Sequence, residues 1–525
     1  MSRVDADPAT APPSAALILV VAGTSLSLAQ FAALREYAAL LGSNELVALL
    51  VLCAYFLGLS IGYHVSGRLS RRALLWLGGC TLALNASLPF SVRWFAGAMS
   101  AIRLDGNVPP AIFLLVLCGI TPFYAVFLPR LIDQARPDEP GTRPLVRLYA
   151  AELAGACVGL ALVILITPAR MGLLLSLQLA GLVTLLVLFA RPRRRAVLAL
   201  YALLPLYFAA YPALDRASLT WLYERFQTCD NAEILASEFS PYQRVDIVRA
   251  DTPGRLNVTF LYLNGNLLYG TRSLHRHNLF VALLPNFLSP TNPGRVCVIA
   301  GGSLDNARYL APRTRSLDVV ELDEAVVRLT RRHIQEPLGA FPTNWRLTID
   351  DGKHFLGTWQ GEPFDVISVD VPIPTHLQTA MLHSQRFFAL ARTQLRPGGI
   401  FSISLAGRLH ALPGGRTRLS NRILAGLLAT FPHVTVVRSG DTDFAWAGDS
   451  PFPIDAATAQ QRMNSNLDLN PRLREEVGEP TLSFLDPAEV RALAAGCEPI
   501  GEADMKLVLQ LSLSKLYYRY YDPTE

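Results

Sequence analysis

The sequence predicts a two-part protein, in which a helical membrane domain precedes a doubly wound α/β domain. Three observations support this prediction: the chain has 525 residues, it is 51% hydrophobic and only 17% charged, and nearly all of its long apolar runs lie before about residue 213. This length suggests two or three domains, and the composition is unusual for a soluble enzyme. The hydrophobic excess therefore belongs to the N-terminal half, because the later sequence has the periodicity of an ordinary globular protein.

The N-terminal half contains several runs near the roughly 20 apolar residues that a helix needs to cross a bilayer. The candidate spans are 15–34, 46–66, 73–92, 109–130, 146–168, 172–190 and 196–213. The last run is short and contains Pro205 and Pro212, so the sequence predicts six or seven helices over 15–213. Residues 1–14 carry acids and prolines in place of a basic cluster, which predicts an N-terminal tail and not a cleaved signal peptide.

The fifth run contains a pair of small residues and an acid. Gly155 and Gly159 have the spacing that lets two helix backbones approach closely. Glu152 lies one turn earlier, and a carboxylate at membrane depth is costly unless it has a partner or faces a polar cavity. We favour a helix-end pair with an arginine, and a substrate or proton site is the alternative.

The side of the membrane that carries the soluble domain depends on the seventh run. The arginine-rich connections 67–72 and 191–195 are typical of cytoplasmic loops and place the N-terminus inside. A seventh crossing would then place the C-terminal domain outside, whereas a run 196–213 lying in the interface would leave it in the cytoplasm. We expect a multi-pass protein of the cell (inner) membrane with a cytoplasmic soluble domain, and the sidedness stays open.

Cysteines and charge argue against two classes of site. The seven cysteines form no CxxC pair, so neither a disulfide framework nor a metal site is indicated, and we expect small core residues. The net charge is +5, and the basic residues do not gather into a stripe suited to nucleic acid. The expected partners are therefore the lipid bilayer and a small molecule, with a homo-oligomer left open.

Residues 214–285 are predicted to form a linker and a small β-hairpin domain. The segments 244–251 and 257–271 have strand patterns. Asn264 and Gly265 supply the tight turn of a hairpin, because both residues tolerate positive φ.

Residues 286–525 alternate strands with helices, which predicts a parallel, doubly wound sheet. The predicted strands are 295–300, 317–322, 345–350, 364–370 and 399–405, and the predicted helices lie near 305–311, 323–335 and 377–395. After about residue 406 the pattern weakens. It predicts a late strand and turn over 444–452, a helix over 486–496 and an aromatic packing element over 515–523.

Ligands of such sheets bind outside the carboxyl ends of the strands. The first strand ends at Gly301–Gly302, where the backbone has room for a nucleotide, and Glu321 follows about twenty residues later, where a carboxylate can bind both ribose hydroxyls. Asp350 and Asp351 end the third strand and can accept from an adenine amino group, and Asp370 ends the fourth. An acid at a strand end is also often a helix N-cap. The pattern predicts a nucleoside-type ligand.

The motifs resemble the spermidine synthase (polyamine aminopropyltransferase) family over about residues 235–405. They are SPYQRVDIV (240–248), LYLNGNLLYG (261–270), VCVIAGGS (296–303), DVVELDEAVV (318–327), LTIDDGKHFL (347–356), FDVISVD (364–370) and RFFALARTQLRPGGIFSISL (386–405). The N-terminal half is similar to the bacterial membrane-fused branch of that family, in LGLSIGYHVSGRLSRR (57–72) and LYAAELAG (148–155).

The resemblance implies a Rossmann-like, class I methyltransferase-type fold and a metal-free transferase. Its reaction moves an aminopropyl group from decarboxylated S-adenosylmethionine to an amine such as putrescine and releases methylthioadenosine. It also implies site roles: Asp370 takes a proton from the amine, Glu321 binds the ribose, Asp351 binds the adenine, Gln243 lies near nucleoside and amine, and His277 and Asn278 bind substrate.

Two positions depart from the family pattern. Ser303 stands where soluble members carry an aspartate that pairs with the co-substrate ammonium, and losing that pair costs about 1–3 kcal/mol if it is buried. Asp305 either substitutes for it or caps the following helix. Ile373 replaces the second acid of the fourth-strand motif. Methyl transfer from S-adenosylmethionine and a non-catalytic sensor or transport partner for polyamines or adenosyl ligands are therefore alternatives.

Overall fold

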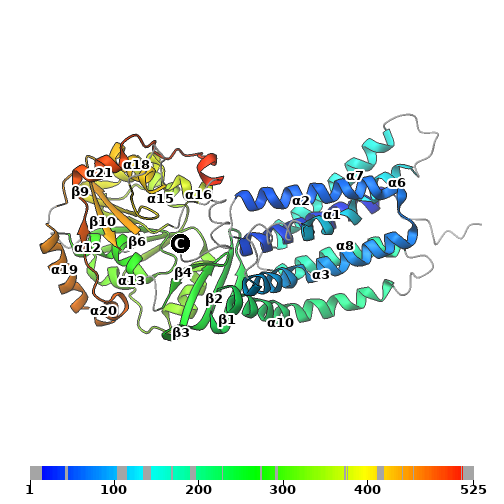
Figure 1. Ribbon diagram of the computed structural model, residues 1–525, viewed down its shortest axis with the longest axis horizontal. Coiled ribbons are helices and arrows are strands. Elements are labelled where there is room, and N and C mark those ends of the chain that lie inside the picture. Colours follow the sequence, from blue (N-terminus) through cyan, green and yellow to red (C-terminus); the bar gives the residue numbers. More distant parts are fainter. Residues whose placement is uncertain are drawn as a thin grey trace, which may run out of the picture.

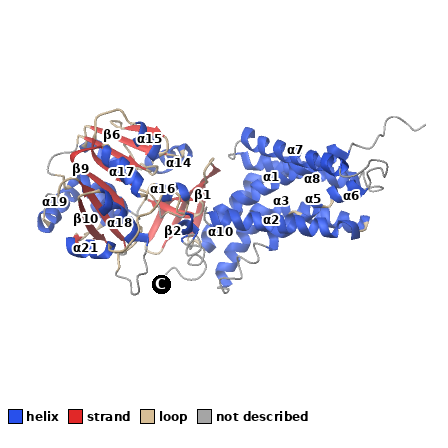
Figure 2. Cartoon of the chain, turned by 90° about the horizontal axis from the view of Figure 1, so that it is seen from above, coloured by secondary structure: helices blue, strands red, loops and turns tan. Residues whose placement is uncertain are grey.

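The computed structural model describes residues 15–511 with short gaps. The gaps are 42–44, 103–114, 134–142, 167–169, 190–196, 228, 272–274, 290–293, 372–373, 375, 411–418, 440–441, 453–454 and 510. The protein is elongated, with a helical bundle at one end and two β-sheets at the other (Figures 1 and 2). The tail over 1–14, Ile373 and the aromatic segment 515–523 lie outside the described residues.

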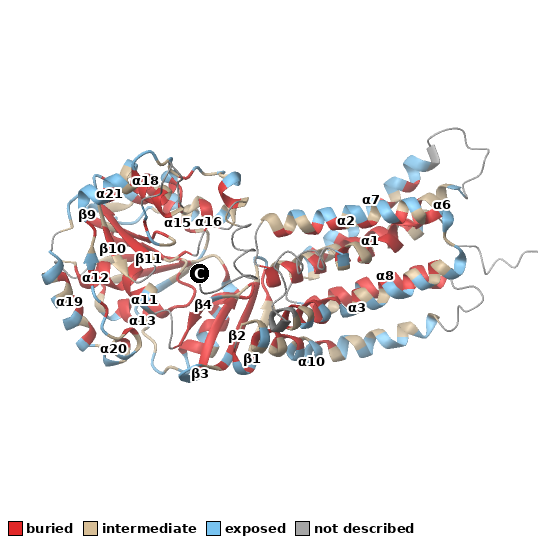
Figure 3. Ribbon diagram, viewed as in Figure 1, coloured by how far each residue is buried: buried red, intermediate tan, exposed pale blue. Residues whose placement is uncertain are grey.

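The bundle consists of antiparallel helices that run along its long axis (Figure 1). They are α1 (Ala15–Leu41), α2 (Glu45–Val65), α3 (Arg71–Ile102), α5 (Pro122–Ala125), α6 (Phe127–Asp133), α7 (Arg143–Ile166), α8 (Met171–Phe189) and α10 (Leu200–Phe226). Six segments of the described chain are long and apolar enough to cross a membrane, and α10 is not among them. Large apolar side chains such as Phe56, Ile164 and Leu165 are exposed on the bundle surface, and exposed apolar patches of this kind mark a contact with another protein or with a membrane (Figure 3).

Helices α1 and α7 are in close contact at Gly155 and Gly159, the small residues predicted to allow it. A Cβ on Gly155 would lie 2.2 Å from the Val20 carbonyl oxygen, and one on Gly159 would lie 2.7 Å from the Thr24 carbonyl oxygen. The two backbones can approach this far only because both residues are glycine. Glu152 is buried at 7% exposure and makes no ion pair with an arginine of the described chain, so the favoured arginine pairing is wrong.

The predicted cysteine burial is correct for some residues and wrong for others. Cys229 and Cys297 are buried, whereas Cys53, Cys80 and Cys157 are exposed on the bundle. Those three lie on faces that the helices turn outward, where an apolar environment would come from lipid and not from a protein core.

A four-stranded antiparallel sheet links the bundle to the α/β domain. Its strands β1 (Asp230–Phe239), β2 (Arg244–Thr252), β3 (Arg255–Leu263) and β4 (Asn266–Gly270) follow one another in chain order. The predicted hairpin is confirmed, because Asn264 and Gly265 have φ of 48° and 66° and join β3 to β4. The sequence analysis missed β1, and α10 continues past residue 213 to end at Phe226, just before this strand.

The α/β domain has an eight-stranded sheet of order β12-β10-β11-β9-β8-β5-β6-β7. The strands are β5 (Arg295–Ile299), β6 (Ser316–Glu321), β7 (Arg346–Ile349), β8 (Phe364–Val369), β9 (Leu395–Ser404), β10 (His433–Ser439), β11 (Thr442–Gly448) and β12 (Ser483–Phe484). The five strands β5 to β9 are parallel to one another, which confirms the predicted parallel sheet. Antiparallel β11 and β10 extend it at the C-terminal end.

Helices cover both faces of this sheet (Figure 2). They are α11 (His275–Asn278), α12 (Leu284–Phe287), α13 (Asp305–Leu310), α14 (Glu324–Thr330), α15 (Gly352–Thr358), α16 (Leu377–Met381), α17 (Gln385–Thr393), α18 (Leu419–Thr430), α19 (Ala456–Asp468), α20 (Pro471–Val477) and α21 (Pro487–Ala494). The predicted helix over 377–395 is broken into α16 and α17, because Ser384 caps a new start by accepting from Phe387 N–H.

The bundle and the small sheet share one hydrophobic core. Leu219 and Tyr223 of α10 pack with Val248, Val258 and Phe260 of the small sheet, all at most 4% exposed. The two parts are therefore joined by a packed interface and not by a free linker.

Candidate active site

The loop between β5 and α13 is shaped by its glycines. A Cβ on Gly302 would lie 2.6 Å from Glu321 Oε2, and one on Gly301 would lie 2.8 Å from the Val319 side chain. Ala300 and Leu304 bracket the loop with φ of 61° and 56°, a region that non-glycine residues rarely adopt. The two glycines allow this tight loop. Its backbone lies against the carboxylate of Glu321, at the end of β6.

Glu321 ends β6 beside this loop. Its Oε1 accepts from the Asp323 backbone N–H at 3.0 Å. Burial disfavours the charged form, and it raises the pKa of Glu321 to about 7. A ligand that donates hydrogen bonds to this carboxylate would stabilise its charged form.

Gln243 reaches the same strand end through Asp323. Gln243 Nε2 donates to Asp323 Oδ2 at 3.2 Å, and Ser240 Oγ donates to the same oxygen at 2.6 Å. Asp323 also caps α14 by accepting from Ala325 N–H. Sequence reasoning missed Ser240 and Asp323, although both lie in the SPYQ and ELDE motifs that it singled out.

Asp350 and Asp351 already have partners within their own helix turn. Asp351 Oδ1 accepts from the backbone N–H groups of Lys353 and His354, at 2.9 and 3.0 Å, and so caps α15. Asp350 pairs with the His354 ring, whose Nδ1 lies 2.7 Å from its Oδ2. Both acids lie at the carboxyl end of β7, but Asp351 has the capping role that competes with ligand binding at strand ends.

Asp370 lies past the end of β8 between an imidazole and an amide. His277 Nε2 lies 3.1 Å from Asp370 Oδ1, and Asn306 Nδ2 donates to Oδ2 at 3.1 Å. Its backbone N–H donates to the carbonyl of Ile299, which ties it to β5. Asn306 is 1% exposed, and its Oδ1 has no partner within the described chain. Sequence reasoning missed Asn306, which the GGSLDNAR motif contains.

Asn278 is hydrogen-bonded to a second carboxylate, that of the buried Asp305. Its Nδ2 donates to Asp305 Oδ2 at 3.0 Å, and Tyr269 O–H donates to Asp305 Oδ1 at 3.2 Å. Asp305 is 2% exposed and makes no side-chain cap on α13, so it is not the helix cap that was one of its two expected roles. Burial, together with this carboxylate, holds the pKa of Tyr269 well above its usual range.

Comparison with known proteins supports the resemblance in the motifs. The family model described as Spermine/spermidine synthase domain matches residues 277–407. A polyamine aminopropyltransferase of Mycobacterium tuberculosis (strain CDC 1551 / Oshkosh) is 28% identical over 465 residues, which cover 82% of this chain and 84% of that protein. The polyamine aminopropyltransferase of Oceanobacillus iheyensis is 24% identical over 81% of this chain and 83% of its own length.

The chain therefore carries a spermidine synthase-type domain, and it is similar to polyamine aminopropyltransferases over most of its length. These relatives are transferases, and so is this enzyme. Among solved structures, a spermidine synthase in complex with the transition state analogue AdoDATO is 20% identical with a TM-score of 0.38, covering 47% of this chain and 88% of that one. The spermidine synthase of Thermotoga maritima has the same TM-score and identity, over 50% and 87%.

In this chain the site residues form two adjoining groups. In the first, Gln243 and Glu321 both bond Asp323 and Gly302 lies against Glu321. In the second, His277 and Asn306 both lie against Asp370. The loop over 301–306 joins the groups. Ser303, in that loop, is 6% exposed, and its carbonyl accepts from Gln335 Nε2 at 2.7 Å.

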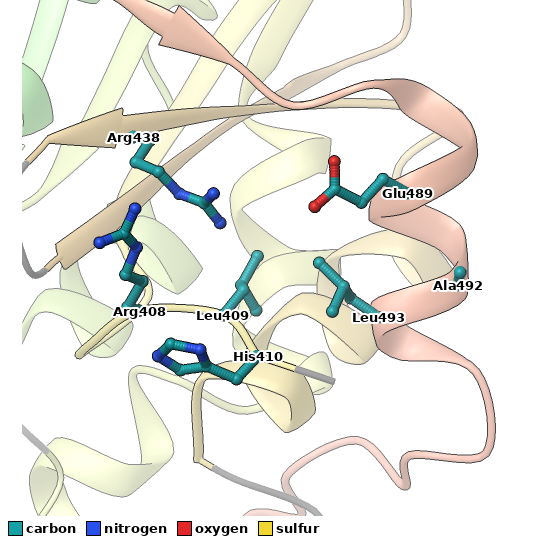
Figure 4. A pocket seen from close by; sticks show the side chains of 7 residues that line it. All are labelled: Arg408, Leu409, His410, Arg438, Glu489, Ala492 and Leu493. Carbon is teal, nitrogen blue, oxygen red and sulfur yellow. The ribbon is translucent and has the colours of Figure 1, made fainter. Parts of the chain in front are cut away.

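A separate cavity of about 450 Å³ lies far along the sheet, beside α21 (Figure 4). Arg408, His410, Arg438 and Glu489 line it, and it includes no predicted site residue. Arg438 is already paired with Asp443. Within the described residues no cluster of three or more His, Cys, Asp or Glu could hold a metal ion.

Proposed function

We propose that this enzyme moves an aminopropyl group from decarboxylated S-adenosylmethionine to a putrescine-like amine and releases methylthioadenosine. One observation carries the proposal: Glu321 and Asp370 end the two strands that flank β5, on either side of its glycine loop. This is the position at which doubly wound sheets bind ligands. The sulfonium of the co-substrate supplies an electrophilic carbon and a thioether leaving group.

The glycine loop fits a bound nucleoside. Because Gly302 has no side chain, Glu321 stays close to the loop and can accept from both ribose hydroxyls. Gln243 is held by Asp323 at the edge of the same group. For the adenine we propose Asp350 and Asp351, with Asp351 using the oxygen that does not cap α15.

Asp370 is proposed as the base. The amine nitrogen forms a bond to the carbon beside sulfur while the carbon–sulfur bond breaks, and the nitrogen must lose a proton to Asp370. Asn306 and His277 hold this carboxylate in place. Alignment of the two reactants supplies much of the rate enhancement.

Ser303 favours a second candidate reaction. A neutral hydroxyl cannot pair with the free ammonium of the aminopropyl donor, so methyl transfer from S-adenosylmethionine remains an alternative. Asp305 lies two residues further on and carries the missing charge, but it is bound by Tyr269 and Asn278. A product assay separates the two reactions, because aminopropyl transfer releases methylthioadenosine and methyl transfer releases S-adenosylhomocysteine.

The test uses purified enzyme in detergent with either donor and a panel of amines. Methylthioadenosine release with at least one diamine, abolished by Asp370→Asn, supports the proposal. Release of S-adenosylhomocysteine alone supports the second candidate. If neither product forms with any amine, both reactions are excluded.

We propose that the bundle anchors this enzyme in the cell membrane. Arg68, Arg71 and Arg130 lie at the end of the bundle opposite the sheets (Figure 1). The positive-inside rule assigns an arginine-rich end to the cytoplasm. Because α10 runs along the bundle and ends at the sheets, at the other end from these arginines, this rule would place the catalytic domain outside, against our expectation of a cytoplasmic domain (Figure 1).

A reporter fusion decides the sidedness. Alkaline phosphatase fused to the C-terminus is active only outside the cytoplasm, and a fluorescent protein there is bright only inside. An external domain would need its adenosyl co-substrate supplied on that side, so the result also bears on the reaction. We further propose 15–213 as the membrane domain, 214–285 as the connecting unit and 286–525 as the catalytic domain.

A further inference from the structure

The corner between α1 and α2 reaches the two chain segments that carry candidate substrate-binding groups. Arg35 and Glu36 are adjacent in the last turns of α1, and Glu45 begins α2. All three side chains bond to residues more than 200 positions away, outside the bundle.

Arg35 holds the start of the 240–244 segment. Its Nη1 donates to the Pro241 carbonyl at 3.3 Å, and its Nη2 donates to the Ser240 carbonyl. The guanidinium also lies over the Phe239 ring, 5.1 Å from its centroid. Charge-assisted hydrogen bonds of this kind are stronger than neutral ones.

Glu36 holds the end of the same segment. Its Oε2 lies 3.5 Å from Arg244 Nη1, and both side chains are 1% exposed. Two consecutive residues of one helix therefore bracket Gln243, which lies between Pro241 and Arg244 and donates its side-chain amide to Asp323.

A short chain of hydrogen bonds continues from this bracket to the strand end. Ser240, whose carbonyl accepts from Arg35, donates its hydroxyl to Asp323 at 2.6 Å. The Asp323 backbone N–H donates in turn to Glu321 Oε1. A change at Arg35 thus acts on Glu321 through only two intermediate residues.

Glu45 holds the chain segment that follows Asp370 in the sequence. Its Oε1 accepts from the Leu377 backbone N–H at 3.1 Å, and its Oε2 lies 3.7 Å from His376 Nδ1. These residues begin α16, which lies beside the start of α2 and follows Asp370 by six to seven positions (Figure 1).

We propose that Arg35 and Glu45 are positioning residues, through which the membrane bundle sets the two walls of the active site. Arg35 fixes the nucleoside side, and Glu45 fixes the amine side. The bundle is then part of the catalytic unit as well as an anchor. This inference rests on the proposed function, since it assigns nucleoside and amine to these walls.

The test measures methylthioadenosine affinity and steady-state kinetics for full-length Arg35→Gln, Glu45→Gln and the wild-type enzyme in detergent. We expect Arg35→Gln to weaken methylthioadenosine binding about tenfold, the effect of losing one charge-assisted hydrogen bond. Glu45→Gln should raise the KM for the amine while methylthioadenosine affinity stays near wild type. Arg35→Lys keeps the charge and should recover part of the lost affinity. Arg249→Gln, on the exposed side of the small sheet, is the control and should change neither constant.

The outcomes separate this inference from the proposed function. If both variants lower only the unfolding temperature and leave affinity and KM unchanged, the bundle is merely a support and the inference is overturned. The same holds if Arg35→Lys and Arg35→Gln bind methylthioadenosine as tightly as the wild type. Absence of turnover in the wild type would overturn the proposed function, whereas weakened methylthioadenosine binding by Arg35→Gln would still support the nucleoside-side positioning.

Discussion

Charged side chains have different partners in two regions of the molecule. At the junction between bundle and sheets they pair with opposite charges, whereas in the candidate active site the carboxylates are bound by backbone, amide and imidazole groups. At the junction Arg93 lies between Glu36 and Asp215, at 2.9 and 2.6 Å, and Arg244 bonds Asp246 at 2.9 Å. In the site, Glu321 and Asp370 are bound by a backbone N–H, an amide and an imidazole.

This difference separates structural charges from functional ones. A buried ion pair whose members satisfy each other is held in one geometry, and removing one member leaves a costly isolated charge. A carboxylate that is bound by a backbone N–H or an amide still has charge to offer a cationic or hydrogen-bond-donating ligand. Mutations in the two regions should therefore affect different measurements.

The largest expected effect is on stability, from Arg93→Met at the junction. This change removes the ion-pair partner that Glu36 and Asp215 share in a largely buried region. The free energy of unfolding should therefore fall by about 3–5 kcal/mol. Thermal unfolding in detergent measures the loss. The double variant with Glu36→Gln should regain part of the lost stability. An unchanged unfolding temperature in the single variant would show that the junction charges do not stabilise the fold.

Asp370→Asn should have the opposite profile. We expect turnover to fall about a hundredfold or more, because the variant cannot take the amine proton. Methylthioadenosine affinity and the unfolding temperature should stay near wild type. Asp449→Asn, a surface carboxylate paired with Arg392, is the matched control. A loss of stability as large as that of Arg93→Met would assign Asp370 a structural role.

Glu321 should make ligand binding depend on pH. With its pKa raised to about 7, the carboxylate ionises as pH rises from about 6 to 8, so methylthioadenosine affinity should increase over that interval. The stability contribution has the opposite sign, because a folded-state pKa above the unfolded value favours folding at low pH and is lost as pH rises toward about 7. Glu321→Gln should weaken binding about tenfold and flatten both profiles. Titration calorimetry at several pH values checks this.

Gly302→Ala tests the close approach of loop and carboxylate. The new Cβ would lie 2.6 Å from Glu321 Oε2, so the side chain must move, at a cost of about 1–3 kcal/mol in binding or stability. Gly357→Ala is the control, since its nearest neighbour would be 4.0 Å away. Equal methylthioadenosine affinities for the two variants would show that ligand binding does not depend on the close approach of Gly302 to Glu321.

The smallest effect is expected at the exposed pair of Glu233 and Arg249. These side chains are 62% and 44% exposed and 3.2 Å apart, so replacing either should change unfolding by less than about 0.5 kcal/mol. A larger change measured by thermal unfolding would show that solvent exposure does not separate weak from strong pairs here.

The sequence alone determined the features that depend on local pattern. Apolar runs set the long helices of the bundle, and six described segments are long and apolar enough to cross a membrane. Alternating strand and helix patterns set the parallel sheet, and the topology of such sheets brings Gly302, Glu321 and Asp370 to one edge.

Only the tertiary structure decided which groups these residues meet. Asn306 on Asp370, Asp323 on Gln243, and Arg35 and Glu36 around the 240–244 segment join positions about 60 to 200 residues apart, and no local period encodes such pairs. The role of Asp351 was open in the sequence, because a strand-end acid can cap a helix or bind a ligand, and the structure shows it as the cap of α15.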